Sequence, residues 1–370
     1  MKTLLFGLAW CFVFWLVPAG ASDEVLPQKF RVATYNLFRF SGNSKGTNAP
    51  GIDPSPKEQE ARDAIAHVLK RVNPDILVVQ EIGDKRWLEN LRRDLEAVGV
   101  VYPAENCEFV FGNDRHNHLA VLAKYPWKSA SWNVRGDFLT RGFISSRFKM
   151  QDGEDFYVFP VHLKSQIGTK TDPKCTKRRS RELLVLRSLI SQGVPAELHE
   201  RRDFFAGMIK IFEQYGVPFE KKTEFDGRDL TTEYWERPAS TPELFVILGD
   251  FNTPPDAPEI KIFREKQLFA VPVEAVPAVM RKTADLSTDE GRRRNPRLDN
   301  FSYVIKYAYS PNKNLRERNI AEMCGQLDQI FLSPQAFKRR KNTPAIICNY
   351  DYSWLGSDHR CLYIDFDFSE

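Results

Sequence analysis

The sequence predicts a layered α/β fold, because buried and alternating strands are separated by amphipathic helices. Residues 244–248 are five consecutive apolar residues, as in a fully buried strand, whereas the apolar residues of 362–368 alternate, as in a strand with one buried face. The strand-like runs between residues 108 and 162 follow one another closely, which favours antiparallel hairpins. A purely parallel sheet is therefore not expected.

The first elements can be placed from their boundary signals. We expect a strand at 30–36, then a Gly- and Pro-rich loop, then a helix that begins at the capping box 55–58, with Pro56 at its first position. Asn73-Pro74 ends this helix before a second strand at 76–81. The further expected elements are helices at 87–98, 176–190 and 205–212 and strands at 109–111, 119–123, 143–148, 156–162, 244–250, 327–332 and 362–368.

Residues 1–21 have the features of a secretion signal: Lys2, an apolar centre from Leu4 to Val17, and the small residues 19–21. The apolar run is shorter than the ~20 residues of a membrane span. We therefore predict an exported protein, periplasmic or extracellular, with no stable membrane span. Residues 28–369 are expected to form a single domain with insertions at about 191–243 and 268–320, because the chemically active residues are spread over that whole length.

Charge and cysteine content say little about function. Loss of residues 1–21 would remove one lysine and no acid, so the formal charge would fall from +4 to +3, too little to indicate nucleic-acid binding by itself. The basic clusters near 174–179, 292–297 and 338–341 are each expected to be solvated faces. An oxidising compartment would permit one or two disulfides among the five cysteines after residue 21, but their spacing gives no pairing and no zinc site.

Several apolar runs end in polar residues capable of chemistry. In 244–252, Asp250 and Asn252 follow the strand two positions apart, so they should face the same side. In 356–368 the order is reversed, because Asp358 and His359 precede the strand. The candidate site residues found in this way are Asn36, Glu81, His162, Asp250, Asn252, Asp328, Asp358 and His359.

Together these side chains could perform metal-assisted hydrolysis of a phosphoester. Mg²⁺ takes oxygen ligands and needs only one or two carboxylates, which Glu81 could provide with Asn36 or Asp358 nearby. His359 is a candidate base for an attacking water, with Asp328 orienting its ring. His162, if protonated, and Asn252 could donate hydrogen bonds to the phosphate. Asp250 could orient the water or lie near the metal.

Each of these residues also has an ordinary structural explanation. An Asn at a strand end is usually a cap or a turn residue, and an Asp within a strand can simply face solvent. The histidines outside the set (His67, His116, His118 and His199) are expected to be structural. It is the joint occurrence of eight such residues at strand ends that favours a functional site.

Six segments of the chain, in order, resemble the motifs of the endonuclease/exonuclease/phosphatase superfamily. This superfamily includes deoxyribonuclease I, abasic-site endonucleases, sphingomyelinases and inositol-polyphosphate phosphatases. The resemblance covers residues from about 30 to 368, and its motifs are 34–36 (Thr-Tyr-Asn), 79–81 (Val-Gln-Glu), 162–165 (His-Leu-Lys-Ser), 249–252 (Gly-Asp-Phe-Asn), 327–330 (Leu-Asp-Gln-Ile) and 357–359 (Ser-Asp-His).

The resemblance implies a four-layer α/β sandwich of two face-to-face mixed sheets flanked by helices, and Mg²⁺-dependent hydrolysis, with Mn²⁺ as a substitute. It implies metal roles for Asn36, Glu81 and Asp358 and catalytic roles for His162, Asp250, Asn252, Asp328 and His359. Arg141 lies where relatives often place a phosphate-contacting side chain. The segments 191–243, 268–320 and 115–118 depart from the family pattern, and such loops select the substrate in a shared fold.

Three functions follow as hypotheses. The leading one is an exported metal-dependent phosphodiesterase, most simply a nuclease. The second is a phosphatase or sphingomyelinase-like hydrolase of a small or lipid phosphoester, for which Trp354-Leu355 is a candidate apolar contact. The third, from another class, is an inactive binding protein of the same fold. The expected partner is a phosphoester substrate, with nucleic acid as one candidate, and no protein partner is implied.

Overall fold

The computed structural model describes residues 25–41, 57–112, 117–132, 134, 138–193, 198–217, 241–263, 269–340 and 343–369. The predictions for residues 1–21, 55–56 and 115–116, and for the 218–240 part of the expected insertion, lie outside these residues. No helix of the described chain is long and apolar enough to span a bilayer.

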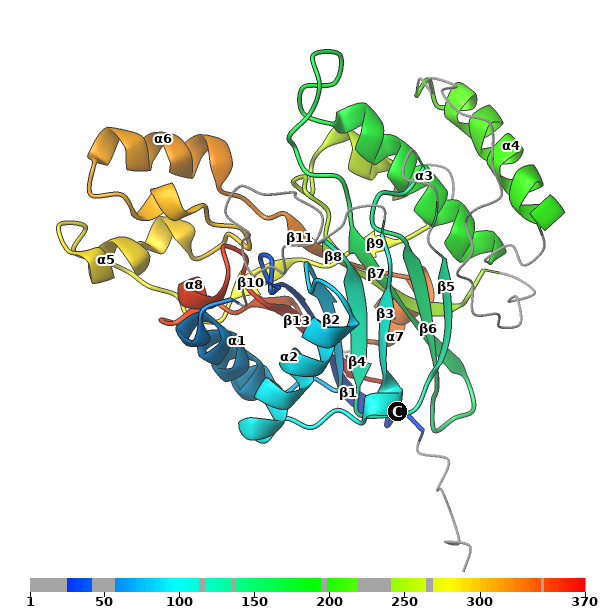
Figure 1. The fold of residues 1–370 in the computed structure, drawn as a ribbon, viewed down its shortest axis with the longest axis horizontal. Coiled ribbons are helices and arrows are strands. Elements are labelled where there is room, and N and C mark those ends of the chain that lie inside the picture. The colour runs from blue at the N-terminus through cyan, green and yellow to red at the C-terminus, as the bar shows by residue number, and fades with distance from the viewer. Residues whose placement is uncertain are drawn as a thin grey trace, which may run out of the picture.

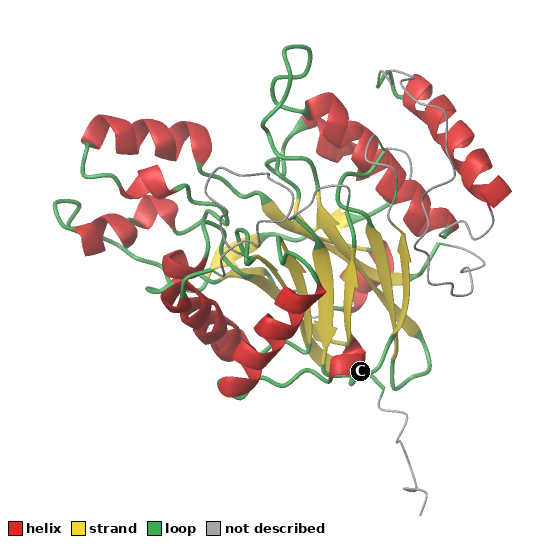
Figure 2. Cartoon of the chain, viewed as in Figure 1, coloured by secondary structure: helices red, strands yellow, loops and turns green. Residues whose placement is uncertain are grey.

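Two mixed sheets form the centre of the molecule (Figures 1 and 2). One has seven strands in the order β10-β12-β13-β1-β2-β4-β3, and the other has six in the order β5-β6-β7-β8-β11-β9. The first comprises β1 (Lys29–Asn36), β2 (Ile76–Gln80), β3 (Cys107–Val110), β4 (Leu119–Ala123), β10 (Ala275–Pro277), β12 (Ala345–Ile347) and β13 (Leu362–Asp367). The second comprises β5 (Lys128–Trp132), β6 (Phe143–Lys149), β7 (Asp155–His162), β8 (Leu244–Asp250), β9 (Val271–Pro272) and β11 (Asp328–Leu332).

Helices cover the outer faces of both sheets. In Figure 1, α1 and α2 lie on one side of the strands and α3 and α4 on the other, while α5 and α6 project from one end. The α-helices are α1 (Gln59–Val72), α2 (Lys85–Ala97), α3 (Thr176–Gln192), α4 (Leu198–Gln214), α5 (Asp289–Arg293), α6 (Lys313–Met323), α7 (Pro334–Arg339) and α8 (Ser353–Gly356). The short 3-10 helices are η1 (Ala104–Asn106), η2 (Pro258–Phe263), η3 (Pro296–Leu298) and η4 (Lys306–Tyr309).

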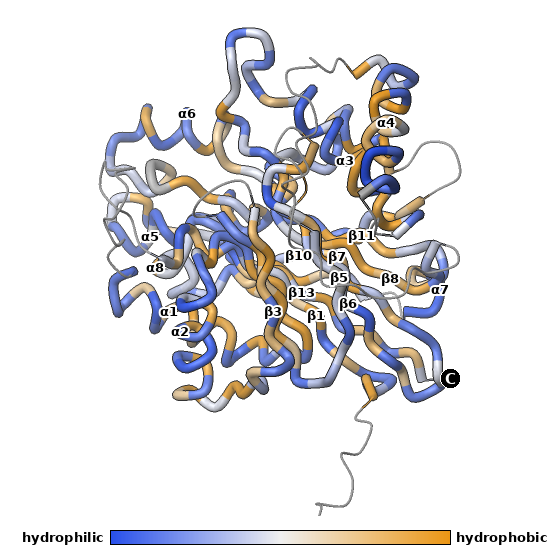
Figure 3. Tube along the Cα trace, turned by 45° about the vertical axis from the view of Figure 1, so that its right-hand side comes forward, coloured by the Kyte–Doolittle hydropathy of each residue, from blue (hydrophilic) through white to orange (hydrophobic). Residues whose placement is uncertain are grey.

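The apolar side chains form three main layers of core, which explains the four-layer arrangement. One cluster, with Val32, Val158 and Ile364, lies between the two sheets. A second joins the outer face of the seven-stranded sheet to α1 and α2, and a third joins the six-stranded sheet to α3 and α4. In Figure 3 the hydrophobic segments accordingly concentrate on the central strands. The predicted sandwich of two face-to-face mixed sheets is confirmed.

Some element boundaries differ from those predicted. Helix α1 begins at Gln59, because Glu58 has an extended backbone (φ −53°, ψ 143°) and caps the helix without a side-chain hydrogen bond. The predicted capping box placed Glu58 inside the helix, and its extended backbone contradicts that placement. Strand β5 was missed because its sequence, Lys-Ser-Ala-Ser-Trp, has no apolar run. All five cysteines of the described chain are free thiols, although Cys348 and Cys361 are neighbours, with the Cys348 N–H donating to the Cys361 carbonyl.

Candidate active site

The candidate residues lie at one edge of the paired sheets because each stands at a strand end. Asn36 ends β1, beside Gln80 at the end of β2. His162 and Asp250 end the parallel strands β7 and β8 and are register partners. Asp328 begins β11, which runs antiparallel to β8, so Asp328 is also opposite Asp250.

Tight backbone geometry brings the last residues of these strands into the site. Glu81 (φ 60°) and Asn252 (φ 52°) both adopt the left-handed conformation, which is uncommon for residues other than glycine. Gly249 has φ 147°, and a Cβ there would lie 1.9 Å from the Val161 carbonyl oxygen. The glycine of the Gly-Asp-Phe-Asn motif therefore lets β8 pack closely against β7 and places Asp250 beside His162.

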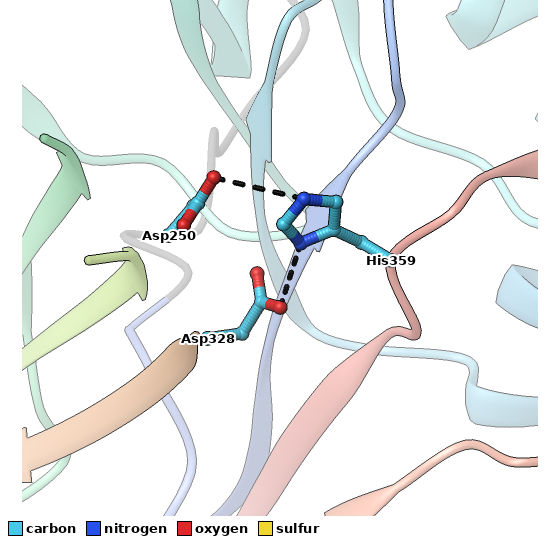
Figure 4. Close-up of side chains that lie close together, drawn as sticks. All are labelled: Asp250, Asp328 and His359. Carbon is cyan, nitrogen blue, oxygen red and sulfur yellow. Dashed lines mark hydrogen bonds and ion pairs between the residues drawn. The ribbon is translucent and has the colours of Figure 1, made fainter. Parts of the chain in front are cut away.

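Asp328 and His359 form a buried hydrogen-bonded pair (Figure 4). Nδ1 of His359 lies 2.8 Å from Oδ2 of Asp328, and Nε2 on the opposite side of the ring lies 3.7 Å from Oδ2 of Asp250. Burial alone would lower the pKa of His359, but the Asp328 and Asp250 carboxylates outweigh it and raise the pKa to about 10. The ring is therefore held in one orientation and charged at neutral pH, with Nε2 directed at Asp250.

His162 is buried next to the same Asp250 carboxylate. Its Nε2 lies 3.7 Å from Oδ2 of Asp250 and 3.8 Å from Oε1 of Glu81. Its Nδ1 has no hydrogen-bond partner among the described residues. Burial, followed by the charges of Arg141 and His359, lowers the pKa of His162 well below its usual value. The sequence predicts a donor role for His162 on the condition that it is protonated, and a neutral imidazole still has one N–H to donate.

Three carboxylates share this small volume. Burial raises the pKa of Asp250 to about 7, and burial together with the nearby Glu81 charge raises the pKa of Asp358 to about 6. Oδ1 of Asp358 is buried and accepts no hydrogen bond from the described chain. A set of oxygen donors with raised pKa values and an unpaired buried oxygen fits a hard divalent cation such as Mg²⁺. Ligand atoms of Asp250, Asp328 and His359 also lie within 4.8 Å of one another.

The two amides of the site contact Asp250 rather than an open space. Nδ2 of Asn36 donates to Oδ2 of Asp250 (2.9 Å), and Oδ1 of Asn36 accepts from the Phe38 N–H (3.0 Å). Nδ2 of Asn252 donates to the Leu163 carbonyl (2.9 Å) and to Asp250 (3.1 Å). In this structure both amides therefore fix the Asp250 carboxylate. The predicted roles of Asn36 as a metal ligand and Asn252 as a phosphate donor stay predictions.

Comparison with known proteins identifies the family. The sequence profile of the endonuclease/exonuclease/phosphatase family matches residues 33–359, which include all eight residues of the site. The chain belongs to this family. Its members are typically metal-dependent phosphoester hydrolases. No curated protein sequence matches the chain.

Three of the solved structures that are similar to this chain come from Streptomyces, Bacteroides and Staphylococcus species. Sphingomyelinase C from Streptomyces griseocarneus is 14% identical with a TM-score of 0.53, and the match covers 91% of this chain and 99% of that one. A family member from Bacteroides vulgatus is 15% identical (TM-score 0.48; 92% and 99% covered). Beta toxin from Staphylococcus aureus, solved with bound magnesium ions, is 13% identical (TM-score 0.48; 92% and 99% covered). At these identities the sphingomyelinase likeness shows the fold alone.

The structure adds residues to this family site that the sequence did not single out. Nζ of Lys57 donates to the carbonyls of Leu37 (2.6 Å) and Phe38 (2.9 Å), and burial lowers its pKa to about 8 despite Asp358 and Glu81 nearby. Oγ of Ser357 donates to the Asn36 carbonyl and accepts from the His359 N–H. No spacing rule marks these residues, because their positions depend on loops that meet only in the folded chain.

The structure also shows the surroundings of Arg141 and of two histidines outside the candidate set, His67 and His118. Arg141 is buried, donates to the Leu163 carbonyl (3.0 Å) and lowers the pKa of neighbouring His162, and its predicted contact with a phosphate stays a prediction. His118 packs between the rings of Phe109 and Phe111 and accepts from the Gly112 N–H, and His67 is an exposed helix residue. The structural interpretation of these two histidines agrees with their surroundings.

The basic clusters are less solvated than expected. Arg292 is buried and donates to the carbonyls of Ser287 and Tyr309, and Arg179 is buried in a salt bridge with Glu259. Arg293 lies over the Trp354 ring at 3.6 Å. The expectation that these clusters are purely solvated faces is wrong at Arg292 and Arg179, because both bury their guanidinium groups against acceptors.

Proposed function

We propose that this protein is an exported, metal-dependent phosphodiesterase, and that nucleic acid is its substrate. The observation that carries the proposal is the buried pair of Asp328 and His359 with Nε2 aimed at Asp250 (3.7 Å), in the midst of the Glu81, Asp250 and Asp358 carboxylates. A positioned imidazole beside a cation-binding carboxylate group is what the hydrolysis of a phosphoester by water requires.

Glu81 and Asp358, with Asn36 beside them, would hold a divalent cation, Mg²⁺ or Mn²⁺. When bound, the cation would neutralise phosphoryl oxygens and stabilise the charge that develops during in-line displacement. Asn36 and Asn252 hold Asp250 in place through their side-chain amides. Asp250, whose pKa lies near neutrality, is then suited to orient the attacking water and accept its proton.

His359 fits the role of a charged donor better than the role of base that its sequence position favoured. Asp328 occupies Nδ1 and stabilises the imidazolium, so Nε2–H can donate to the phosphoryl group. Neutral His162, whose Nε2 also lies 3.7 Å from Asp250, and the Arg141 guanidinium near it would contact the phosphate as well. The substrate phosphorus would lie between the two histidines.

Nucleic acid is favoured by the loop that follows His162 and leads into α3. Lys170 and Lys174 on this loop and Lys177 in the first turn of α3 are exposed, and no acidic side chain of the described chain pairs with them. Lysines beside a phosphodiesterase site would bind the backbone phosphates flanking the scissile one, and such binding weakens steeply with salt.

A lipid phosphoester is the second candidate because the same loop carries an apolar tip. Ile167 is 83% exposed and is followed by the loop lysines, a combination that would suit an anionic membrane surface. Trp354, the candidate that the sequence offered for this contact, is covered on one face by Arg293 and donates from Nε1 to the Asp351 carbonyl. The apolar contact of the lipid hypothesis would therefore be Ile167.

A substrate panel tests the proposal. The purified chain would be incubated with plasmid DNA, RNA, sphingomyelin vesicles, an inositol polyphosphate and bis(p-nitrophenyl) phosphate, with Mg²⁺ and with EDTA. We expect Mg²⁺-dependent cleavage of DNA or RNA that EDTA abolishes. Preferential hydrolysis of sphingomyelin would select the lipid alternative, and no hydrolysis of any substrate together with retained metal binding would select the inactive binding protein.

A further inference from the structure

The chain between β10 and β11 (residues 278–327, here called the β10–β11 segment) forms backbone hydrogen bonds with the residues on either side of His359. Residue 303 forms antiparallel bridges with residue 359 on one side and residue 325 on the other. On either side of His359, the Val304 N–H donates a hydrogen bond to the Asp358 carbonyl (2.8 Å) and the Arg360 N–H donates one to the Ser302 carbonyl (2.7 Å). The segment is therefore held in register with His359.

Further contacts hold the same stretch in place. Oγ of Ser302 accepts from the N–H of Asp328 (2.9 Å), the residue that orients His359. The buried Arg360 guanidinium donates to the carbonyls of Leu298 and Phe301. Residues 298–304 are thus fixed by both members of the Asp328–His359 pair, although they belong to a segment that departs from the family pattern.

Tyr303 is the side chain that this stretch places in the site. Its ring lies 4.8 Å from the His359 ring, centroid to centroid, at an interplanar angle of 52°. Burial, and then the charges of Asp358, Asp250 and Glu81, raise the pKa of its hydroxyl. Tyr303 is partly exposed, and no described residue forms a hydrogen bond with its hydroxyl.

A phenol in this position can act only as a neutral donor. It stays protonated beside the carboxylates, so it brings no additional negative charge to an approaching phosphate. Its rigid ring is packed against the imidazole, so little conformational entropy is lost when the hydroxyl makes a bond. A preorganised donor without an internal partner is suited to a ligand oxygen.

We propose that Tyr303 is a substrate-contacting residue of this active site, whose hydroxyl donates a hydrogen bond to an oxygen of the phosphate group. The inference rests on the proposed phosphodiesterase function and extends it, because it assigns part of the phosphate site to the β10–β11 segment. The substrate is thereby bound from both sides: by the His162 side of the six-stranded sheet and by the segment bonded to His359.

The competing explanation is that Tyr303 only packs against His359 and fixes its ring. The two roles separate under two substitutions. Tyr303→Phe removes the hydroxyl and keeps the ring, whereas Tyr303→Leu removes both. Tyr363→Phe is the matched control, since the Tyr363 ring lies against Arg31 and packs with the core cluster under α1 and α2, outside the site.

The experiment measures two quantities for the wild type and the three variants: kcat/KM for bis(p-nitrophenyl) phosphate with Mg²⁺, and the Kd of inorganic phosphate by calorimetry. Thermal unfolding verifies that each variant is folded. We expect Tyr303→Phe to lower kcat/KM by about 10- to 100-fold, the usual effect of losing a hydrogen bond to a charged group, and to weaken phosphate binding. Tyr363→Phe should match the wild type in both.

The outcomes distinguish this inference from the proposed function. If Tyr303→Phe equals the wild type while Tyr303→Leu is impaired, the ring is structural and the inference is overturned. Unchanged phosphate affinity in Tyr303→Phe also overturns it, even where turnover falls. If the wild type hydrolyses no phosphoester but binds phosphate, and Tyr303→Phe weakens that binding, the phosphodiesterase proposal fails and the Tyr303 contact stands.

Discussion

His162 ends β7 in the six-stranded sheet and His359 precedes β13 in the seven-stranded sheet, and Nε2 of each ring lies 3.7 Å from the same Asp250 oxygen. Both are buried, with 3% and 6% of their surface exposed. His359 has a carboxylate at 2.8 Å from Nδ1, and its pKa rises; His162 has no partner at Nδ1 within the described chain, and its pKa falls. The hydrogen-bond partner, rather than burial, therefore decides which histidine is charged.

The two sides of the site consequently differ in what they offer a phosphate. The His359 side carries a charged N–H that can be donated to the phosphoryl group, and the His162 side offers a neutral donor next to the permanently charged Arg141. Because carboxylates lie close to both histidines, a cation and a phosphate can be accommodated with little net charge. Changes on the two sides should therefore have different consequences.

The largest effect is expected at His359. His359→Ala should lower kcat by two or more orders of magnitude, because it removes the imidazolium directed at Asp250 and leaves Asp328 without its partner. The measurement is steady-state turnover of bis(p-nitrophenyl) phosphate, with circular dichroism to verify folding. His67→Ala, on the exposed side of α1, is the matched control, and wild-type turnover in His359→Ala would remove this residue from the mechanism.

A smaller effect with a different pattern is expected at His162. A neutral imidazole that donates one hydrogen bond can be replaced in part by an amide, so His162→Gln should retain more activity than His162→Ala, which we expect to lose about 10- to 100-fold. His359→Gln should be as poor as His359→Ala, because an amide cannot carry the charge. Equal rescue by Gln at both positions would contradict the charge difference between the two rings.

The protonation states can be measured directly by NMR titration of the imidazole resonances in EDTA. His359 should lose its proton near pH 10 and His162 should stay neutral at neutral pH, while Asp328→Asn should shift the His359 titration to lower pH. Since the folded pKa of His359 lies above the ordinary value of 6.5, its stabilising contribution is complete below pH 6.5 and is lost as the pH rises through 10. Titration of His359 near 6.5 would contradict the assigned charge difference.

Substitution of Glu81 tests cation binding independently of the two histidines. Glu81→Gln should weaken Mg²⁺ binding about ten-fold, because it removes one charge from the carboxylate group. Calorimetric Mg²⁺ titration of the free protein measures this independently of activity. Glu60→Gln, in the first turn of α1, is the control, and an unchanged Mg²⁺ affinity in Glu81→Gln would exclude Glu81 as a ligand.

The sequence predicted the location of the site well because strand ends are encoded locally. A buried apolar run followed by Asp250, or preceded by His359, defines both the strand and its polar end, and the register of neighbouring strands then brings such ends together. The charge states were not predictable in the same way. They depend on which side chain meets Nδ1 of each ring, and the 2.8 Å contact joins residues 31 positions apart in the chain.

The loops around the site show where local patterns fail. Arg292, Arg293 and Arg294 form one basic run in the sequence, yet the fold buries the first against carbonyls, places the second on Trp354 and pairs the third with Asp351. No sequence pattern marked Tyr303, because its segment has no strand-like alternation of apolar residues and forms only isolated bridges. Side chains held by long-range backbone bonds are visible only in the structure.

The smallest effect is therefore expected at this basic run. Arg292 is structural, so the informative variant is the double substitution Arg293→Gln with Arg294→Gln. This variant should leave the salt dependence of DNA binding nearly unaltered, because both side chains already have partners. Lys174→Gln with Lys177→Gln, between His162 and the first turn of α3, should reduce the slope of log K against log salt by about 0.9 for each backbone phosphate that a lysine no longer neutralises. Fluorescence anisotropy across a salt series measures both slopes. A larger reduction of the slope in the arginine pair than in the lysine pair would show that DNA enters over the β10–β11 segment, and the His162 side would then not be the entrance.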